Sequence, residues 1–166
     1  MILGMSTATF TQLHVIISLV GIASGLIVVL AMLGARSVPA WAAIFLATTV
    51  ATSVTGFMFH FASFGPPEIV GAISLAVLAV AILALYSYKL AGAWRRIYVV
   101  AAVFALYLNV FVAVVQSFEK VPALRALAPT QSEPPFQVAQ LIVLVGFVAL
   151  GVLALRRFRR AHTAFA

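Results

Sequence analysis

Five long apolar stretches constrain this chain more than any other feature, because each lacks Asp, Glu, Lys and Arg except at its ends. About 20 helical residues cross a hydrocarbon core about 30 Å thick. A backbone in lipid must satisfy its own hydrogen bonds, and these stretches lack the alternating polarity of a barrel strand. The sequence therefore predicts one all-α domain, residues 1–166, built as a bundle of five transmembrane helices at about residues 13–33, 41–61, 68–88, 97–118 and 138–155.

The basic residues are distributed unequally over the two sides of this bundle. One side has only Lys120 and Arg125, and the other side has all the rest: Arg36, Lys89, Arg95, Arg96, Arg156, Arg157, Arg159 and Arg160. The positive-inside rule then places the amino terminus outside and the carboxyl terminus inside. The net charge of +7 lies mostly beside membrane ends, which indicates anionic lipid headgroups rather than nucleic acid as partners. We expect a multi-pass protein of the bacterial inner membrane.

The longest connection, residues 119–137, falls on the outer side. Pro122 suits a first helical turn, Val121 and Leu124 share a helical face, and Pro129 ends the apolar run. This pattern predicts a short helix lying on the membrane surface, followed by a proline-rich approach to the fifth span.

Composition excludes several kinds of chemistry. The chain has no cysteine, so it has neither thiolate metal ligands nor disulfides, and the absence of Asp excludes a Ser-His-Asp hydrolase. An odd number of spans without an internal repeat disfavours an inverted-repeat transporter. Whether the protein is an enzyme stays open.

The polar residues at the outer side are the candidates for a functional site. His14 and His60 come from antiparallel neighbours at similar depth, which suits two imidazoles bound to one metal or to a haem. With Glu68 or Glu119 as an oxygen donor, the set suits zinc, copper or iron. Gln116 and Gln140 open onto the same side and would be hydrogen-bonding neighbours. We therefore predict an outer polar pocket that binds haem b or a transition metal and exchanges electrons with quinol or a periplasmic protein.

Other functions fit the same residues. Histidines near an interface also reach headgroups or hydrogen-bond a neighbour, and Thr49, Thr52, Ser53 and Asn109 are typical of helix packing. One alternative is an accessory, assembly or lipid-binding subunit that uses residues 119–137 as its contact surface. Another is a homo-oligomer that encloses a channel. Because no charged residue or histidine lies near mid-membrane, proton-coupled transport is disfavoured.

Two resemblances accompany these inferences. The segments AGAWRRIYVV, LYLNVFVAVVQSF and APTQSEPPF resemble a family of small, uncharacterised bacterial inner-membrane proteins over most of the chain. His14 and the run TSVTGFMFH are similar to the first two helices of haem-b membrane proteins of the cytochrome b561 type. The second resemblance implies haem ligation by His14 and His60.

Overall fold

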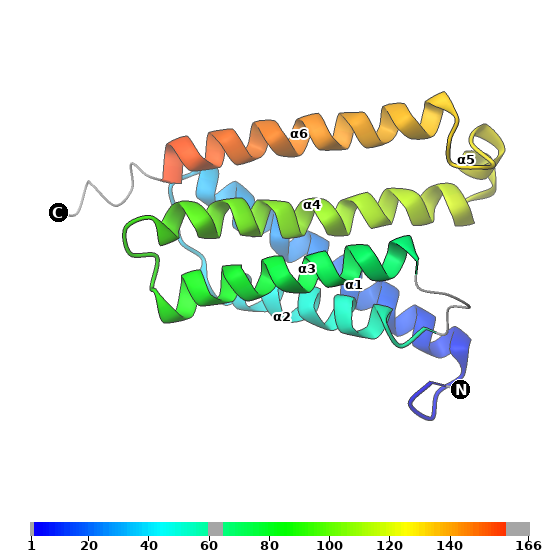
Figure 1. Ribbon diagram of the computed structural model, residues 1–166, viewed down its shortest axis with the longest axis horizontal. Coiled ribbons are helices and arrows are strands. Elements are labelled where there is room, and N and C mark those ends of the chain that lie inside the picture. Colours follow the sequence, from blue (N-terminus) through cyan, green and yellow to red (C-terminus); the bar gives the residue numbers. More distant parts are fainter. Residues whose placement is uncertain (1, 60–64, 159–166) are drawn as a thin grey trace.

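The computed structural model describes residues 2–59 and 65–158. It contains five helices long and apolar enough to cross a membrane, which confirms the prediction of an all-helical protein with five potential spans (Figure 1). These are α1 (Thr7–Leu33), α2 (Pro39–Gly56), α3 (Pro66–Ile82), which continues into a π-helical turn η1 (Leu83–Ser87), α4 (Trp94–Lys120) and α6 (Pro134–Phe158). Between α4 and α6 lies the short helix α5 (Pro122–Leu127). Within the described ranges there is no β-strand.

The first span is longer than its apolar stretch suggests. α1 begins at Thr7, because the Ser6 hydroxyl accepts a hydrogen bond from the Thr9 N–H at 3.1 Å and caps the helix. The second span ends earlier than expected, with α2 giving way to a turn after Gly56. His60 follows that turn and lies outside the described residues.

α4 is the central helix of the bundle. It packs against α1, α3 and α6, whereas α1 and α2 form the most extensive helix pair. Figure 1 shows α1 crossing the other helices obliquely and α6 running beside α4. The core side chains of α1, α2 and α4 meet between these helices, and Phe45 and Leu106 are fully buried there.

A glycine allows the closest approach inside this core. A Cβ atom at Gly25 of α1 would lie 2.7 Å from Leu106 Cδ1 and 2.8 Å from Phe45 Cδ2. Both neighbours are fully buried, so neither can move away into solvent. The crossing of α1 over α2 and α4 therefore requires a residue without a side chain at this position.

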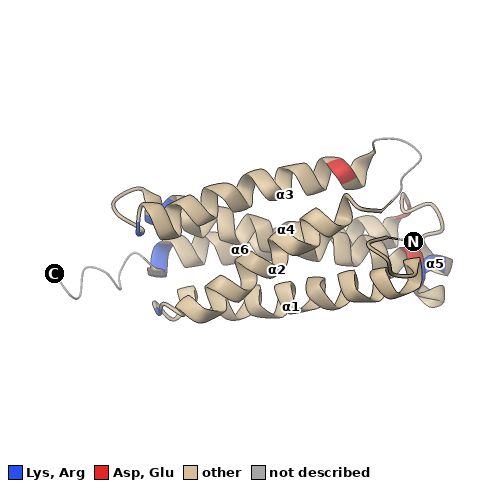
Figure 2. Cartoon of the chain, turned by 90° about the horizontal axis from the view of Figure 1, so that it is seen from below, with Lys and Arg blue, Asp and Glu red and all other residues tan. Residues whose placement is uncertain are grey.

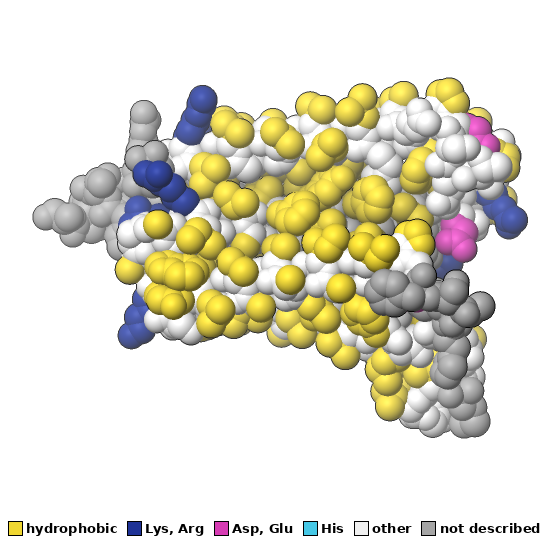
Figure 3. Space-filling view, in the orientation of Figure 1, with side chains coloured by type: hydrophobic (Ala, Val, Ile, Leu, Met, Phe, Trp, Pro, Cys, Tyr) yellow, Lys and Arg dark blue, Asp and Glu magenta, His cyan; other side chains and the backbone are white. Residues whose placement is uncertain are grey.

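Charged residues gather at the two ends of the bundle (Figure 2). One end carries Glu68, Glu119 and Glu133, and we call it the carboxylate end. Lys120 and Arg125 lie at this end as well, and the other described Lys and Arg residues lie at the opposite end. Between the ends the visible surface is mostly apolar (Figure 3). Such a belt is expected of a protein surrounded by lipid.

Candidate functional site

His14 is held in one orientation at the carboxylate end. Its Nδ1 lies 2.8 Å from the Thr55 Oγ1 of α2, and the edge of its ring meets Phe59 with 5.2 Å between ring centroids. The Thr55 hydroxyl already donates its hydrogen to the Ala51 carbonyl at 2.7 Å. Its oxygen must therefore accept from His14, so this hydrogen-bond network assigns a ring hydrogen to Nδ1, and in the neutral imidazole the lone pair is then on Nε2. No described residue hydrogen-bonds Nε2.

Glu68 caps the amino-terminal end of its own helix, α3. Its Oε2 accepts a hydrogen bond of 2.8 Å from the Gly65 N–H, which caps the start of α3, and the residue is only 8% exposed. A carboxylate in the first turn also interacts favourably with the helix dipole. The structure thus shows a structural role for this side chain, and the role of metal ligand stays a prediction.

The two glutamines make separate contacts. Gln116 Nε2 donates to Glu119 Oε2 at 3.3 Å within α4. Gln140 Nε2 of α6 donates to the Phe111 carbonyl of α4 at 3.2 Å, and its Oε1 is buried without a partner in the described structure. Gln140 therefore ties α6 to α4.

The four described candidates lie on elements that reach the same end, but no hydrogen bond joins His14, Glu68, Gln116 or Gln140 to one another. Across residues 2–59 and 65–158, no cluster of three or more His, Cys, Asp or Glu side chains could hold a metal ion. The histidine pair itself is untested, because His60 lies outside those ranges.

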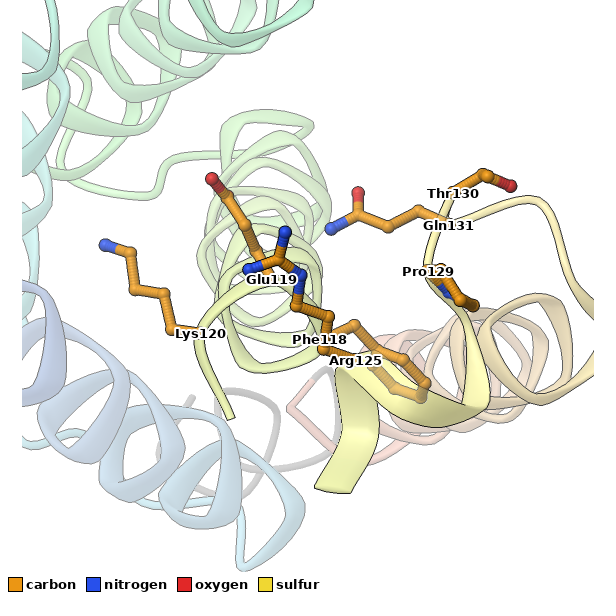
Figure 4. A pocket seen from close by; sticks show the side chains of 7 residues that line it. All are labelled: Phe118, Glu119, Lys120, Arg125, Pro129, Thr130 and Gln131. Atoms are coloured by element: carbon orange, nitrogen blue, oxygen red, sulfur yellow. The ribbon is translucent and has the colours of Figure 1, made fainter. Parts of the chain in front are cut away.

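Sequence reasoning missed a cavity at the carboxylate end. It has a volume of about 390 Å³ and is lined by Phe118, Glu119, Lys120, Arg125, Pro129, Thr130 and Gln131 (Figure 4). The lining comes from the end of α4, from α5 and from the loop before α6. Gln131 Nε2 donates to the Val115 carbonyl at 3.1 Å and so fastens this loop onto α4.

Glu133 organises the other side of the same loop. Desolvation favours a higher pKa for its carboxyl, but hydrogen bonds outweigh it and hold the pKa below its usual value. They come from the Thr130 hydroxyl at 2.8 Å, the Thr130 N–H at 3.1 Å and the Ser132 N–H at 3.1 Å. The ionised carboxylate therefore orders the turn that leads into α6.

Polar side chains deeper in the bundle connect helices. Asn109 Nδ2 of α4 donates to Thr49 Oγ1 of α2 at 3.1 Å, and the Ser53 hydroxyl donates to Ser74 Oγ of α3 at 3.1 Å. A Cβ at Gly21 would lie 3.3 Å from Thr49 Oγ1. These contacts agree with the packing interpretation of Thr49, Ser53 and Asn109.

Comparison with protein-family models, with curated protein sequences and with solved structures finds no match. The resemblances to small bacterial inner-membrane proteins and to cytochromes of the b561 type therefore stay predictions.

Proposed function

We propose that this protein is an accessory subunit of the bacterial inner membrane that binds lipid at its outer side and carries out no catalysis. The carboxylate end is the outer end in this proposal, and the carboxyl terminus is inside. The support is the unequal distribution of cations, because positively charged residues next to membrane ends are retained on the cytoplasmic side.

The observation that carries the proposal is the exposure of α5. None of its residues is buried, although some are large and apolar. Leu127 is 57% exposed, and Val121, which precedes the helix, is 44% exposed. The helix follows directly after the end of α4, where the bundle leaves the apolar belt. Exposed apolar side chains at this level are stabilised when they enter the boundary between headgroups and acyl chains.

The segment is well attached to the bundle. Phe136 packs edge-on against Phe118 with 5.4 Å between ring centroids, and Gln131 bonds the backbone of α4. α5 is thus presented at a fixed place rather than on a free loop, which suits a contact surface.

The depth of α5 in a bilayer tests this proposal. The natural chain has no cysteine, so Leu127→Cys and Thr130→Cys can each carry a single bimane fluorophore. In vesicles that contain lipid brominated near the top of its acyl chains, bimane at residue 127 should be quenched strongly and bimane at residue 130 weakly. Equal, weak quenching at both positions would contradict the proposal.

A second candidate function is electron transfer through haem b or a transition metal bound by His14 and His60. The arrangement of His14 favours it, because a metal-binding histidine usually donates its other ring N–H to a neighbouring acceptor, as Nδ1 does to Thr55. His14 would hold the group through Nε2, and the group would supply redox chemistry when bound. Lys120 and Arg125 would be available for haem propionates.

Absorption spectra of the purified protein, oxidised and dithionite-reduced, test this candidate together with elemental analysis. A Soret band that disappears in His14→Ala and His60→Ala and shifts in Thr55→Val would support it. Thr52→Val is the matched control, because the Thr52 hydroxyl donates to the Thr48 carbonyl of its own helix. A colourless sample without stoichiometric metal would count against it.

A further inference from the structure

We propose that the cavity at the carboxylate end binds the phosphate group of an anionic phospholipid through Lys120 and Arg125. This inference rests on the proposed function, because it needs this cavity to lie at the membrane boundary.

Two cations line this cavity without a carboxylate partner. Neither Lys120 nor Arg125 forms an ion pair with any described residue. Glu119, the acidic residue of the lining, accepts a hydrogen bond from Gln116 instead. Figure 4 shows the Arg125 side chain between Glu119 and Gln131 in projection, with Lys120 extending to the side opposite Thr130.

The placement of these cations is unexpected for the outer side of a membrane protein. Among the Lys and Arg residues that the structure describes, these two alone lie at the carboxylate end, and both line the same cavity. Charge retention on the cytoplasmic side gives no reason for cations here. Two cations and one carboxylate give the lining a net charge of +1, which favours an anion.

The donors of the neighbouring polar side chains Thr130 and Gln131 are already used within the protein, so Lys120 and Arg125 are the groups that would bind the phosphate. The Thr130 hydroxyl donates to Glu133, and Gln131 donates to the Val115 carbonyl. The guanidinium of Arg125 offers a planar set of donors that matches two phosphate oxygens, and Lys120 adds a compact charge.

The apolar parts of the site favour a lipid over a free anion. Phe118 and Pro129 belong to the lining, and the exposed Leu127 lies on the adjoining helix α5. A phospholipid places its phosphate at the level of the cations and its acyl chains beside apolar surface, whereas inorganic phosphate gains nothing from the apolar residues.

The amount of phospholipid that the protein retains after extraction tests this site. The wild type, the Lys120→Gln/Arg125→Gln variant and the Arg36→Gln/Lys89→Gln variant would be equilibrated with vesicles of phosphatidylglycerol and phosphatidylcholine, extracted in mild detergent and analysed by native mass spectrometry. The second variant is the matched control, since it removes two exposed cations from the opposite end. A parallel series contains inorganic phosphate as competitor.

The expected result is that the wild type and the control retain phosphatidylglycerol in preference to phosphatidylcholine. The cavity variant should retain less phosphatidylglycerol by at least about tenfold, because it lacks both charged donors. Equal retention by the cavity variant would overturn this site and leave the lipid-binding function standing. No retention by the wild type would overturn both. Displacement by inorganic phosphate as effective as by added phosphatidylglycerol would overturn the assignment to a lipid.

Discussion

α4 and α6 are similar in length and mean hydropathy, but they differ greatly in how much of their surface is buried in the bundle. They have 27 and 25 residues, and their most apolar windows have mean hydropathies of 2.4 and 2.7. Yet 44% of that window is buried in α4 and only 6% in α6. Hydropathy identifies both as spans but does not rank their burial, because lipid is as apolar as a protein interior. Both helices contain small residues, and the difference lies in how many of them are buried against other helices.

These residues can be identified in the contacts of the two helices. α4 carries the buried alanines Ala101, Ala102 and Ala105 and the hydrogen-bonding Asn109. The middle of α6 is rich in Leu, Ile and Val side chains that are exposed, including Ile142 at 67% and Val145 at 59%. Small residues let helices approach closely, whereas a row of large apolar side chains can be accommodated by lipid.

The largest expected effect comes from the place where α1 meets α2 and α4. Gly25→Ala should lower stability by about 1–3 kcal/mol, because its Cβ would overlap Leu106 and Phe45. Gly146→Ala on α6 is the matched substitution, and a Cβ there has nothing within 4 Å. Thermal unfolding in detergent compares the two variants. If both variants had the same melting temperature, the contrast between the packed interior around α4 and the exposed surface of α6 would not hold.

A smaller effect is expected where α4 hydrogen-bonds α2. Asn109→Ala should destabilise the bundle by about 0.6 kcal/mol and at most about 1.7 kcal/mol, the range found for hydrogen bonds between membrane helices. A double-mutant cycle with Thr49→Val isolates the contact, since Asn109 Nδ2 donates to Thr49 Oγ1. Strictly additive effects would show that the pair contributes nothing.

The corresponding polar residue of α6 should matter still less. Gln140→Leu removes a hydrogen bond to the Phe111 carbonyl, but it also removes a buried Oε1 that has no partner in the described structure. The two changes oppose each other, so we expect a smaller loss of stability than for Asn109→Ala. A loss larger than that of Asn109→Ala would reverse the order of the two helices.

The smallest effect concerns the start of α6 and depends on pH. Hydrogen bonds lower the pKa of Glu133 in the folded protein, so its contribution is present above its usual pKa of 4.5 and is lost as the pH falls through the folded value. Glu133→Gln should therefore melt slightly below the wild type at pH 7, and the difference should shrink below pH 4.5. A difference that grows on acidification would contradict this assignment.

The five spans could be predicted from the sequence because length and apolarity alone determine whether a segment can cross lipid. Asn109 and Thr49 could be placed in the packing for a related reason, since polar side chains in lipid turn toward the protein. The start of α1 at Thr7 depended on a cap by Ser6, a local hydrogen bond that hydropathy does not register.

The candidate site was harder to predict. Glu68 and Gln116 each form a hydrogen bond with a residue three positions away in the chain. A side chain held by such a local bond is not directed into a pocket shared with other helices. The cavity beside Lys120 and Arg125 depends on how α5 and the following loop fold back onto α4, which no periodicity encodes. The tautomer of His14 likewise depends on Thr55, a residue 41 positions away.

α4 forms the interior of the bundle while α6 faces lipid, and single spin labels distinguish these two environments. Labels would be attached to cysteines introduced one at a time at Ala101, Ala102 and Ala105 of α4 and at Leu141, Ile142 and Val145 of α6, and their accessibility to oxygen dissolved in the bilayer would be measured by electron paramagnetic resonance. We expect low accessibility at all three buried α4 positions and high accessibility at all three exposed α6 positions. Equally low values on both helices would contradict the account, because α6 would then be covered by protein rather than by lipid.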